Sequence, residues 1–313
     1  WLQAHLERYA GAIFLISHDR EFLNRVVDSI VDVERSTLKR YRGNYDEFID
    51  AKEAEEEQAM AAYQNQQKEI DRLMLFVNRF RAKNTKAKQA QSKLKQVERM
   101  DKLKAPKSEE RSIQFSFPQP KRSGQRVINL KDVGHAYGQL EVYRGLEFEV
   151  ERGQCIGLVG PNGAGKTTLL KILAGVEALQ SGERLLGPNV DLGYFSQHRV
   201  ETLDENSTVM VEALRTSKPV TETYARSVLG CFMFRGDDVF KQVKVLSGGE
   251  KSRLALVNLL LCPPNLLLLD EPTTHLDIDS VEALVFALKQ FEGTLLFVSH
   301  DVHFLRSLAE RIV

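Results

Sequence analysis

The sequence predicts an α/β fold with a parallel sheet, joined to an antiparallel pair of long helices. Two observations predict the sheet: Leu266–Leu269 and Leu295–Val298 are short and wholly apolar, as strands buried on both faces of a parallel sheet are. A third observation predicts the helices. Between about Tyr45 and Leu103 there is no Gly or Pro, and Ala, Glu, Gln, Lys and Arg predominate. The 313 residues are enough for about two domains.

Composition and charge limit the classes of protein to which the chain can belong. Lys plus Arg and Asp plus Glu both number 43, so the net charge is zero and predicts no partner by itself. Cys155, Cys231 and Cys262 have neither Cys-x-x-Cys nor metal-ligand spacing, which favours a reducing, cytoplasmic setting over a disulfide framework. The richest apolar stretch, residues 254–269, is interrupted by Asn and Pro, so we expect no transmembrane segment in this chain.

Residues 160–167 read Gly-Pro-Asn-Gly-Ala-Gly-Lys-Thr and match the pattern G-x-x-x-x-G-K-[ST]. The motif lies between the strand-like run 155–159 and the helix-like run 168–174. Glycines let backbone N–H groups approach a phosphate, and the helix N-terminus attracts the same anion. The alternative is a glycine-rich turn with a solvated lysine. The predicted nucleotide phosphate site comprises Gly160, Asn162, Gly163, Gly165, Lys166, Thr167 and Thr168, with Lys166 on the β and γ phosphates and Thr167 on Mg²⁺.

Polar residues follow both predicted buried strands. Asp270 and Glu271 come directly after Leu266–Leu269, and His300 follows Leu295–Val298. Ligands bind at the carboxyl ends of strands in open α/β sheets. We therefore expect Asp270 to hold Mg²⁺, Glu271 to polarise an attacking water and His300 to reach the γ-phosphate. The alternatives are two acids that cap the next helix and a structural histidine.

An internal repeat predicts two domains of one type. Gly11–Leu23 recurs as Gly293–Leu305, and each copy is an apolar strand that ends at Ser-His-Asp. His18 is the counterpart of His300. Residues 29–34 and 38–41 read as a closing pair of strands for the first domain. The sequence is therefore interpreted as the central part of a longer tandem protein.

The long helical region is polarised in charge. Apolar residues recur in steps of three and four over Tyr63–Phe80 and over Ala87–Val97, which predicts two antiparallel helices with a turn near Asn84. Acidic residues gather at its start and basic residues at its tip. A solvated helical face is the alternative, but an excess of one sign repels itself unless an anion is nearby. The candidate contacts to that anion are Arg79, Arg81, Lys83, Lys86, Lys88 and Lys93.

The ordered motifs resemble those of ATP-binding cassette (ABC) ATPases. Residues 246–250, Leu-Ser-Gly-Gly-Glu, resemble the signature, and Gln197 resembles the glutamine-loop residue. Asp277 is similar to the D-loop aspartate, and Tyr137 to the aromatic that stacks on adenine. Gln197 as a turn residue and Tyr137 as an ordinary strand aromatic are the alternatives. The resemblance implies a P-loop NTPase cassette with a mixed sheet, flanking helices and a helical subdomain.

The details resemble the ABC-F branch. Residues 271–277, Glu-Pro-Thr-Thr-His-Leu-Asp, are similar to its E-P-T-N-H-L-D, with Thr274 where Asn is usual. Residues 79–83 and 86–92 resemble its hairpin tip. The resemblance implies a cytoplasmic translation factor that uses ATP and Mg²⁺ and contacts the ribosome, tRNA and rRNA. It divides the chain into the tail of a first cassette (1–48), a helical hairpin linker (49–104), an extended linker (105–125) and a second cassette without its C-terminal end (126–313).

The resemblance also implies the roles of the site residues. Glu271, His300 and Gln197 would be catalytic, and Thr167, Gln197 and Asp270 would bind Mg²⁺. The signature would complete the ATP site of a partner cassette, so we expect this chain alone to hydrolyse ATP slowly. Two rival functions are the ATPase subunit of a membrane transporter and a DNA-repair ATPase. The residues assigned to the partner site are Ser247, Gly248, Gly249 and Glu250, with His18 from the first cassette.

Overall fold

A computed structural model describes residues 2–17, 19–34, 37–80, 86–101, 103, 118–196, 202–216, 219–274 and 276–313. The chain divides into two compact units, residues 1–15 with 22–112 and residues 16–21 with 113–313. Of the helices in the described ranges, none combines the length and the apolar composition that a membrane crossing requires.

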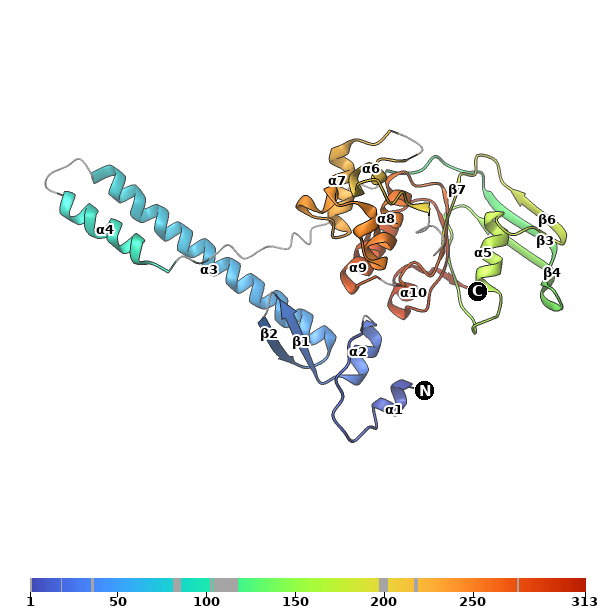
Figure 1. Ribbon diagram of the computed structural model, residues 1–313, viewed down its shortest axis with the longest axis horizontal. Helices are drawn as coiled ribbons and strands as arrows, with labels where there is room; N and C mark the ends of the chain where they lie inside the picture. Colours follow the sequence, from blue (N-terminus) through green and yellow to red (C-terminus); the bar gives the residue numbers. More distant parts are fainter. Residues whose placement is uncertain are drawn as a thin grey trace. The chain divides into compact units, whose positions relative to one another are not determined.

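The first unit contains a two-stranded hairpin followed by a helical hairpin (Figure 1). The strands pair antiparallel from Ser29↔Arg42 to Glu34↔Thr37. Asn44 caps the long helix, because its Oδ1 accepts from the Glu47 N–H at 3.0 Å and its own N–H donates to Glu47 Oε2 at 3.0 Å. The elements up to residue 99 are α1 (Leu2–Leu6), α2 (Arg20–Val26), β1 (Ser29–Glu34), β2 (Thr37–Arg42), α3 (Tyr45–Phe80) and α4 (Ala87–Arg99).

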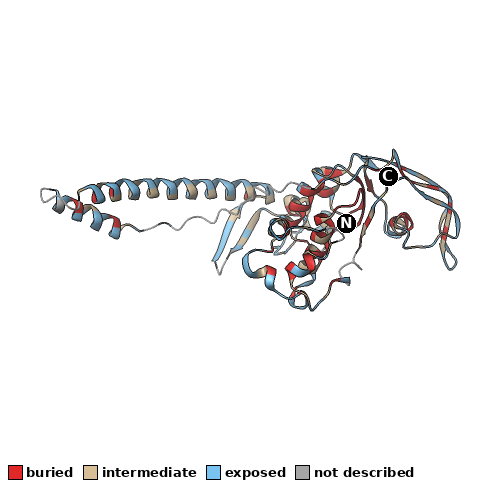
Figure 2. Ribbon diagram, turned by 90° about the horizontal axis from the view of Figure 1, so that it is seen from above, coloured by how far each residue is buried: buried red, intermediate tan, exposed pale blue. Residues whose placement is uncertain are grey.

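Helices α3 and α4 pack side by side through a narrow apolar seam. Leu73 and Val77 of α3 are buried, as are Ala90 and Val97 of α4, whereas most of the long helix is exposed or intermediate (Figure 2). The Gln66 side chain donates to the Asp101 carbonyl and accepts from the Leu103 N–H, both at 2.8 Å. The antiparallel pair of helices is therefore confirmed, and its predicted turn near residue 84 lies outside the described residues.

The second unit has a parallel sheet, an antiparallel sheet and helices. The parallel sheet has the order β10-β5-β9-β8-β7 and the antiparallel sheet the order β4-β3-β6. The α/β fold with a mixed set of strands is confirmed. The elements are β3 (Arg126–Tyr137), β4 (Leu140–Glu151), β5 (Cys155–Leu158), α5 (Lys166–Ala174), β6 (Ser181–Leu186), β7 (Leu192–Phe195), α6 (Val209–Ala213), α7 (Glu222–Cys231), η2 (Gly236–Phe240), η3 (Val243–Val245), α8 (Gly248–Leu261), β8 (Leu266–Asp270), α9 (Ile278–Lys289), β9 (Thr294–Val298), α10 (Val302–Leu308) and β10 (Arg311–Ile312).

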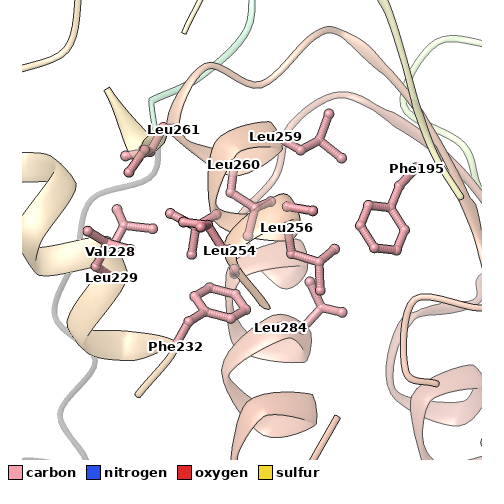
Figure 3. Packing of buried hydrophobic residues seen from close by; sticks show 14 of the residues in the cluster. Phe195, Val228, Leu229, Phe232, Leu254, Leu256, Leu259, Leu260, Leu261 and Leu284 are labelled. Atoms are coloured by element: carbon pink, nitrogen blue, oxygen red, sulfur yellow. The ribbon is translucent and has the colours of Figure 1, made fainter. Parts of the chain in front are cut away.

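Two hydrophobic clusters cover the two faces of the parallel sheet. Leu266 and Leu268 belong to the cluster that contains α5 and the antiparallel sheet. Leu267 and Leu269 belong to the other cluster, in which Phe195 packs with helices α7, α8 and α9 (Figure 3). Successive strand residues point to opposite faces, and both faces of β8 are covered. This explains why β8 is apolar throughout rather than alternating.

A segment without regular structure, residues 118–125, is bound to the amino ends of the parallel strands. Gln119 donates to the Gln290 carbonyl at 2.8 Å and accepts from the Glu292 N–H at 3.0 Å. The Asn265 amide donates to the Lys121 carbonyl at 2.9 Å. We call residues 118–125 the strap. It lies within the predicted extended linker, and β3 begins at Arg126, where the predicted cassette begins.

Candidate functional site

The carboxyl ends of the parallel strands bring the predicted site residues to one edge of the sheet. Asp270 pairs with Val298, and Val298 also pairs with Leu158, so β8, β9 and β5 end level with one another. The phosphate loop follows β5, Glu271 follows β8 and His300 follows β9. Chain topology thus places three segments that are far apart in sequence beside each other.

Gly165 immediately precedes α5 and has a left-handed conformation with φ 98°. A Cβ at this position would lie 2.7 Å from Val142 Cγ1 and 2.8 Å from the Tyr143 hydroxyl oxygen. The Tyr143 hydroxyl donates to the Gly165 carbonyl at 3.0 Å and so holds the loop against β4. Both backbone conformation and space therefore require glycine at residue 165.

Lys166, Thr167 and Asp270 form the base of the loop. The Lys166 ammonium donates to the carbonyls of Gly160 at 2.7 Å and Pro161 at 3.0 Å. The Thr167 hydroxyl donates to Asp270 Oδ1 at 3.1 Å. The carboxylate side chain of the sheet and the hydroxyl of the helix are thus in direct contact.

Asp270 is 8% exposed, and its Oδ2 accepts from the Tyr194 hydroxyl at 3.4 Å. Burial raises the pKa of the Asp270 carboxyl, and the hydrogen bonds from Thr167 and Tyr194, with the charges of Lys171 and Lys166, offset part of that shift. Burial and the charge of Asp270 raise the pKa of Tyr194 to about 12. Tyr194 therefore remains a hydrogen-bond donor at neutral pH.

Glu271 lies beside His300. Its Oε2 accepts from the His300 backbone N–H at 3.3 Å, and its Oε1 is 3.4 Å from His300 Nε2. The backbone of Glu271 has φ 49°, which is uncommon for a residue other than glycine, and its N–H donates to the Val298 carbonyl at 3.0 Å. The Glu271 side chain is 22% exposed and that of His300 is 63% exposed. The structure thus brings together two predicted catalytic residues, with the imidazole open to solvent.

The signature-like residues begin α8. Ser247 Oγ accepts from the Glu250 N–H at 3.3 Å, and Glu250 Oε2 accepts from the Ser247 N–H at 2.8 Å, which is a capping box. Arg253 Nη1 on α8 pairs at 2.7 Å with Oδ2 of Asp277, the residue that caps α9. Among the residues that the structure describes, no hydrogen bond of Ser247, Gly248, Gly249 or Glu250 reaches the loop 160–168.

The remaining residues predicted to bind ATP lie in the phosphate loop, at the start of α5 and at the end of β3. Asn162 and Gly163 are exposed in the loop, Thr168 is 9% exposed, and Tyr137 ends β3 with 45% exposure. His18 and Gln197 lie outside the described residues.

The candidate RNA contacts lie at the end of the helical hairpin. Lys86 Nζ is 4.7 Å from the Phe80 ring centroid, and the Arg79 guanidinium carbon is 5.7 Å from it. The cations therefore gather around an aromatic ring, which is a favourable arrangement. Lys88 and Lys93 follow on α4. Arg81 and Lys83 lie outside the described residues.

Sequence reasoning missed three residues that hold the site. Tyr194 binds Asp270, Tyr143 binds the phosphate loop, and Arg253 joins α8 to Asp277. A signal for Tyr194 existed, because it lies near the carboxyl end of a strand, where ligand sites form. Tyr143 and Arg253 have no comparable signal, since their hydrogen bonds depend on which elements become neighbours in three dimensions.

Comparisons with known proteins bear on the family and the fold of the chain. Two family models match, both described as ABC transporter, over residues 31–116 and 143–274. Among solved structures, the ATP-binding cassette MJ0796 bound to ADP and Pi aligns with a TM-score of 0.51 at 22% identity, over 59% of this chain and 93% of that chain. A bacterial Atm1-family ABC exporter with ATP bound aligns with a TM-score of 0.52 at 20% identity, over 60% of this chain and 37% of that chain. These structures support the fold.

Curated relatives align over nearly the whole chain. YdiF of Bacillus subtilis, which is named for ATP binding, is 44% identical over 100% of this chain and 49% of its own length. YheS of Escherichia coli K12 is 43% identical over 99% of this chain and 48% of its own length. ABC transporter F family member 5 of Arabidopsis thaliana is 34% identical over 100% of this chain and 46% of its own length. The chain spans about half the length of these relatives.

The parallel sheet, the phosphate loop before α5 and the strand-end Asp-Glu pair define a P-loop nucleotide-binding domain. The chain belongs to the ABC-F family of ATP-binding cassette proteins. The family resemblance predicted from the order of the motifs is therefore confirmed.

Proposed function

We propose that the chain binds ATP with Mg²⁺ at the phosphate loop and hydrolyses it together with a second cassette. The contact between the Thr167 hydroxyl and the Asp270 carboxylate carries this proposal, because it joins the loop to the strand-end acids at 3.1 Å. Glu271 and His300 lie at the same edge. The phosphate site, the metal ligands and the catalytic acid are then parts of one site.

Two features of the loop support triphosphate binding: the positive charge of Lys166 and hydrogen-bond donors that are not used within the loop. An ammonium has three donors, and carbonyls of the loop occupy two of those of Lys166. The third can meet a phosphate oxygen without loss of the contacts that hold the side chain across the loop. The first N–H groups of α5 face the same place and favour an anion.

The residues at the base of the loop fit Mg²⁺. A hydroxyl and a carboxylate are the hard oxygen ligands that this ion prefers, and it usually completes its coordination with water and substrate phosphates. Within the described ranges, no group of three His, Cys, Asp or Glu side chains forms a metal cage. Thr167 and Asp270 would hold Mg²⁺, which when bound would neutralise charge on the β and γ phosphates. Gln197 remains a predicted further ligand.

Glu271 and His300 support a hydrolytic role. Glu271 is held at its carboxylate by the His300 N–H, and its strained backbone directs the side chain from the end of β8. In the proposed reaction Glu271 accepts a proton from the attacking water, and the exposed imidazole of His300 donates a hydrogen bond to the γ-phosphate.

The signature residues support the requirement for a second cassette. The capping box orients the start of α8 and uses the Glu250 N–H. Among the described residues the N–H groups of Gly248 and Gly249 have no hydrogen-bond acceptor, so they can bind an anion from outside this cassette. We therefore expect the isolated chain to bind ATP and to hydrolyse it slowly. In the intact protein, the first cassette of the same chain would complete the ATP site, and ATP would close the two cassettes.

The proposed partner of the intact protein is the ribosome, in the cytoplasm. The cations around Phe80 suit phosphates and unstacked bases, since lysine and arginine bind the backbone and an aromatic ring can stack on a base. Closure of the cassettes would position the α3–α4 hairpin near tRNA and rRNA. Hydrolysis would then release the protein.

Sedimentation with ribosomes tests this function. The full-length protein with Glu271→Gln should bind ATP without hydrolysing it, and should therefore stay on ribosomes when ATP is present and leave when ATP is omitted. The matched control is Glu292→Gln, an exposed glutamate at the opposite edge of the sheet. A Glu271→Gln variant that leaves ribosomes as readily as the control would refute the coupling, and preferential binding to duplex DNA would favour a repair ATPase.

A further inference from the structure

The tip of the β3–β4 hairpin holds Tyr137 more firmly than strand pairing alone can. Tyr137 pairs with Leu140 across a two-residue turn that contains Gly138 at φ 61°. On its other side, the pairing of β3 with β6 ends at Gly134↔Ser181, before the chain reaches Tyr137. A strand end with a partner on one side only is expected to fray.

Gln180 supplies the missing partner through its side chain. Its Oε1 accepts from the Ala136 N–H at 2.8 Å, and its Nε2 donates to the Ala136 carbonyl at 2.7 Å. Both main-chain polar groups of the residue next to Tyr137 are thus bonded as they would be by a neighbouring strand. The Gln180 amide therefore extends the sheet and fixes the backbone from which the tyrosine ring projects.

Glu177 and His135 fix the ring itself. The Tyr137 hydroxyl donates to Glu177 Oε2 at 3.4 Å, and the His135 ring meets the Tyr137 ring edge-on, with centroids 4.8 Å apart and planes at 82°. His135 is 4% exposed, and among the described residues neither of its ring nitrogens has a hydrogen-bond partner, although its Nε2 lies 3.9 Å from Glu177 Oε1. Because a buried polar ring without a hydrogen bond is costly, its presence beside Tyr137 suggests a role for the ring contact.

Gln180 and Glu177 come from the segment that follows the phosphate-loop helix. Helix α5 begins at Lys166 and ends before Gly175, and the Glu177 N–H donates to the Lys171 carbonyl at 3.3 Å. We infer that Gln180 and Glu177 are positioning residues for the nucleotide base, which hold the Tyr137 ring in the orientation that stacks on adenine. This inference rests on the proposed ATP site, because it assigns Tyr137 to the base. The helix that begins at the phosphate site is then joined, at its other end, to residues that hold the base site.

The test compares ATP with inorganic tripolyphosphate, which has the same number of phosphates and no base. Calorimetric titration of the 313-residue chain in Mg²⁺ should show that Gln180→Ala raises the Kd for ATP about tenfold, equivalent to about 1.4 kcal/mol, and leaves the Kd for tripolyphosphate unchanged. Glu177→Ala should act in the same direction, and Glu177→Gln, which keeps an oxygen acceptor for the Tyr137 hydroxyl, should restore ATP binding.

Two further variants separate positioning from general damage. Tyr137→Ala should reproduce the selective loss of ATP affinity. Gln154→Ala removes a glutamine whose Oε1 accepts from the Glu151 N–H at 3.0 Å, at the amino edge of the sheet, and should leave both affinities unchanged. An unchanged ATP affinity in Gln180→Ala, or an equal loss of ATP and tripolyphosphate, would overturn the inference while the ATP site stands. A wild-type chain that binds neither compound would overturn the proposed function as well.

Discussion

The two edges of the parallel sheet differ in how far their polar groups are satisfied. At the carboxyl edge, Glu271 has a left-handed backbone, and His300 is largely exposed. At the amino edge, Asn265 is 3% exposed and uses both ends of its amide: Oδ1 accepts from the Asp191 N–H at 2.8 Å, and Nδ2 donates to the carbonyls of Lys121 and Asn189. Free hydrogen-bonding capacity occurs at the edge proposed to bind ATP, and closed hydrogen bonding at the other. Left-handed backbone occurs at both edges, because Asn189 at the amino edge has φ 56°, a conformation that asparagine adopts more readily than glutamate.

The largest expected difference between the two edges is in the ATP turnover rate. Glu271→Gln in the full-length protein should lower the ATP turnover rate by about 10²- to 10⁴-fold, because it removes the proposed general base. Glu292→Gln at the amino edge should leave the rate unchanged. Steady-state phosphate release measures both. Equal rates in the two variants would show that the carboxyl edge has no special catalytic part.

Substitutions at the amino edge of the sheet should lower the free energy of unfolding more than substitutions at the carboxyl edge. Asn265→Ala removes the three hydrogen bonds that this buried amide makes with Asp191, Lys121 and Asn189, and each intramolecular hydrogen bond contributes about 1 kcal/mol to stability. We expect the free energy of unfolding, measured in urea, to fall by about 3 kcal/mol. Asn206→Ala, in an exposed loop, is the control. A loss as small as that of the control would contradict the assignment of Asn265.

The left-handed backbone at Glu271 predicts that glycine is more stabilising than alanine at this position, the reverse of the usual order. Glycine is ordinarily less stabilising than alanine, but at φ 49° the left-handed conformation costs an L-residue about 1–2 kcal/mol that glycine avoids. Both substitutions remove the carboxylate that accepts from the His300 N–H. Glu271→Gly should therefore be more stable than Glu271→Ala by about 1 kcal/mol in the same urea experiment. The reverse order would show that the backbone relaxes at this position.

The smallest expected change in the free energy of unfolding is at the start of α8. This segment is proposed to bind a nucleotide, and yet its capping box satisfies polar groups of Ser247 and Glu250. Burial raises the pKa of the Glu250 carboxyl, but hydrogen bonds from Ser247 and the charges of Arg253 and Lys241 outweigh it, so the folded pKa lies below the usual value. A lowered pKa means that the carboxylate stabilises the fold above its unfolded pKa, and that this contribution is lost as pH falls through the folded pKa. Glu250→Gln should cost about 0.5 kcal/mol at pH 7.

Denaturation of wild type and Glu250→Gln at several pH values measures this difference. The two proteins should converge in stability as the pH falls below 4.5, the ordinary value for the group. A difference that stays constant with pH would assign the effect to packing of the side chain rather than to its charge.

The sequence predicts those parts of the fold that depend on periodicity and on strand order. The wholly apolar run Leu266–Leu269 is a strand covered on both faces, and the placement of Asp270, Glu271 and His300 at one edge follows from parallel pairing. Here the local pattern and the topology lead to the same arrangement.

The residues that hold the site could not be predicted in the same way. Gln180 completes a strand with its side chain, and Tyr194 binds Asp270 across neighbouring strands. Such bonds have no period in the sequence, because polar side chains in loops can bind any main-chain group that the fold brings near. The predicted metal ligand Gln197 and the predicted partner-site residue His18 remain predictions.

The strap determines where a mechanical load would enter the cassette. Tension on the polypeptide before residue 118 would reach the sheet through Gln119, Lys121 and Ser123, whose carbonyl accepts from Arg152 Nη1 at 3.0 Å. These hydrogen bonds are at the amino ends of the strands. Force would therefore be transmitted to the nucleotide-binding edge only through the strands. In a single-molecule pulling experiment, Asn265→Ala should therefore lower the force at which this segment detaches, while bound ATP should leave that force unaltered.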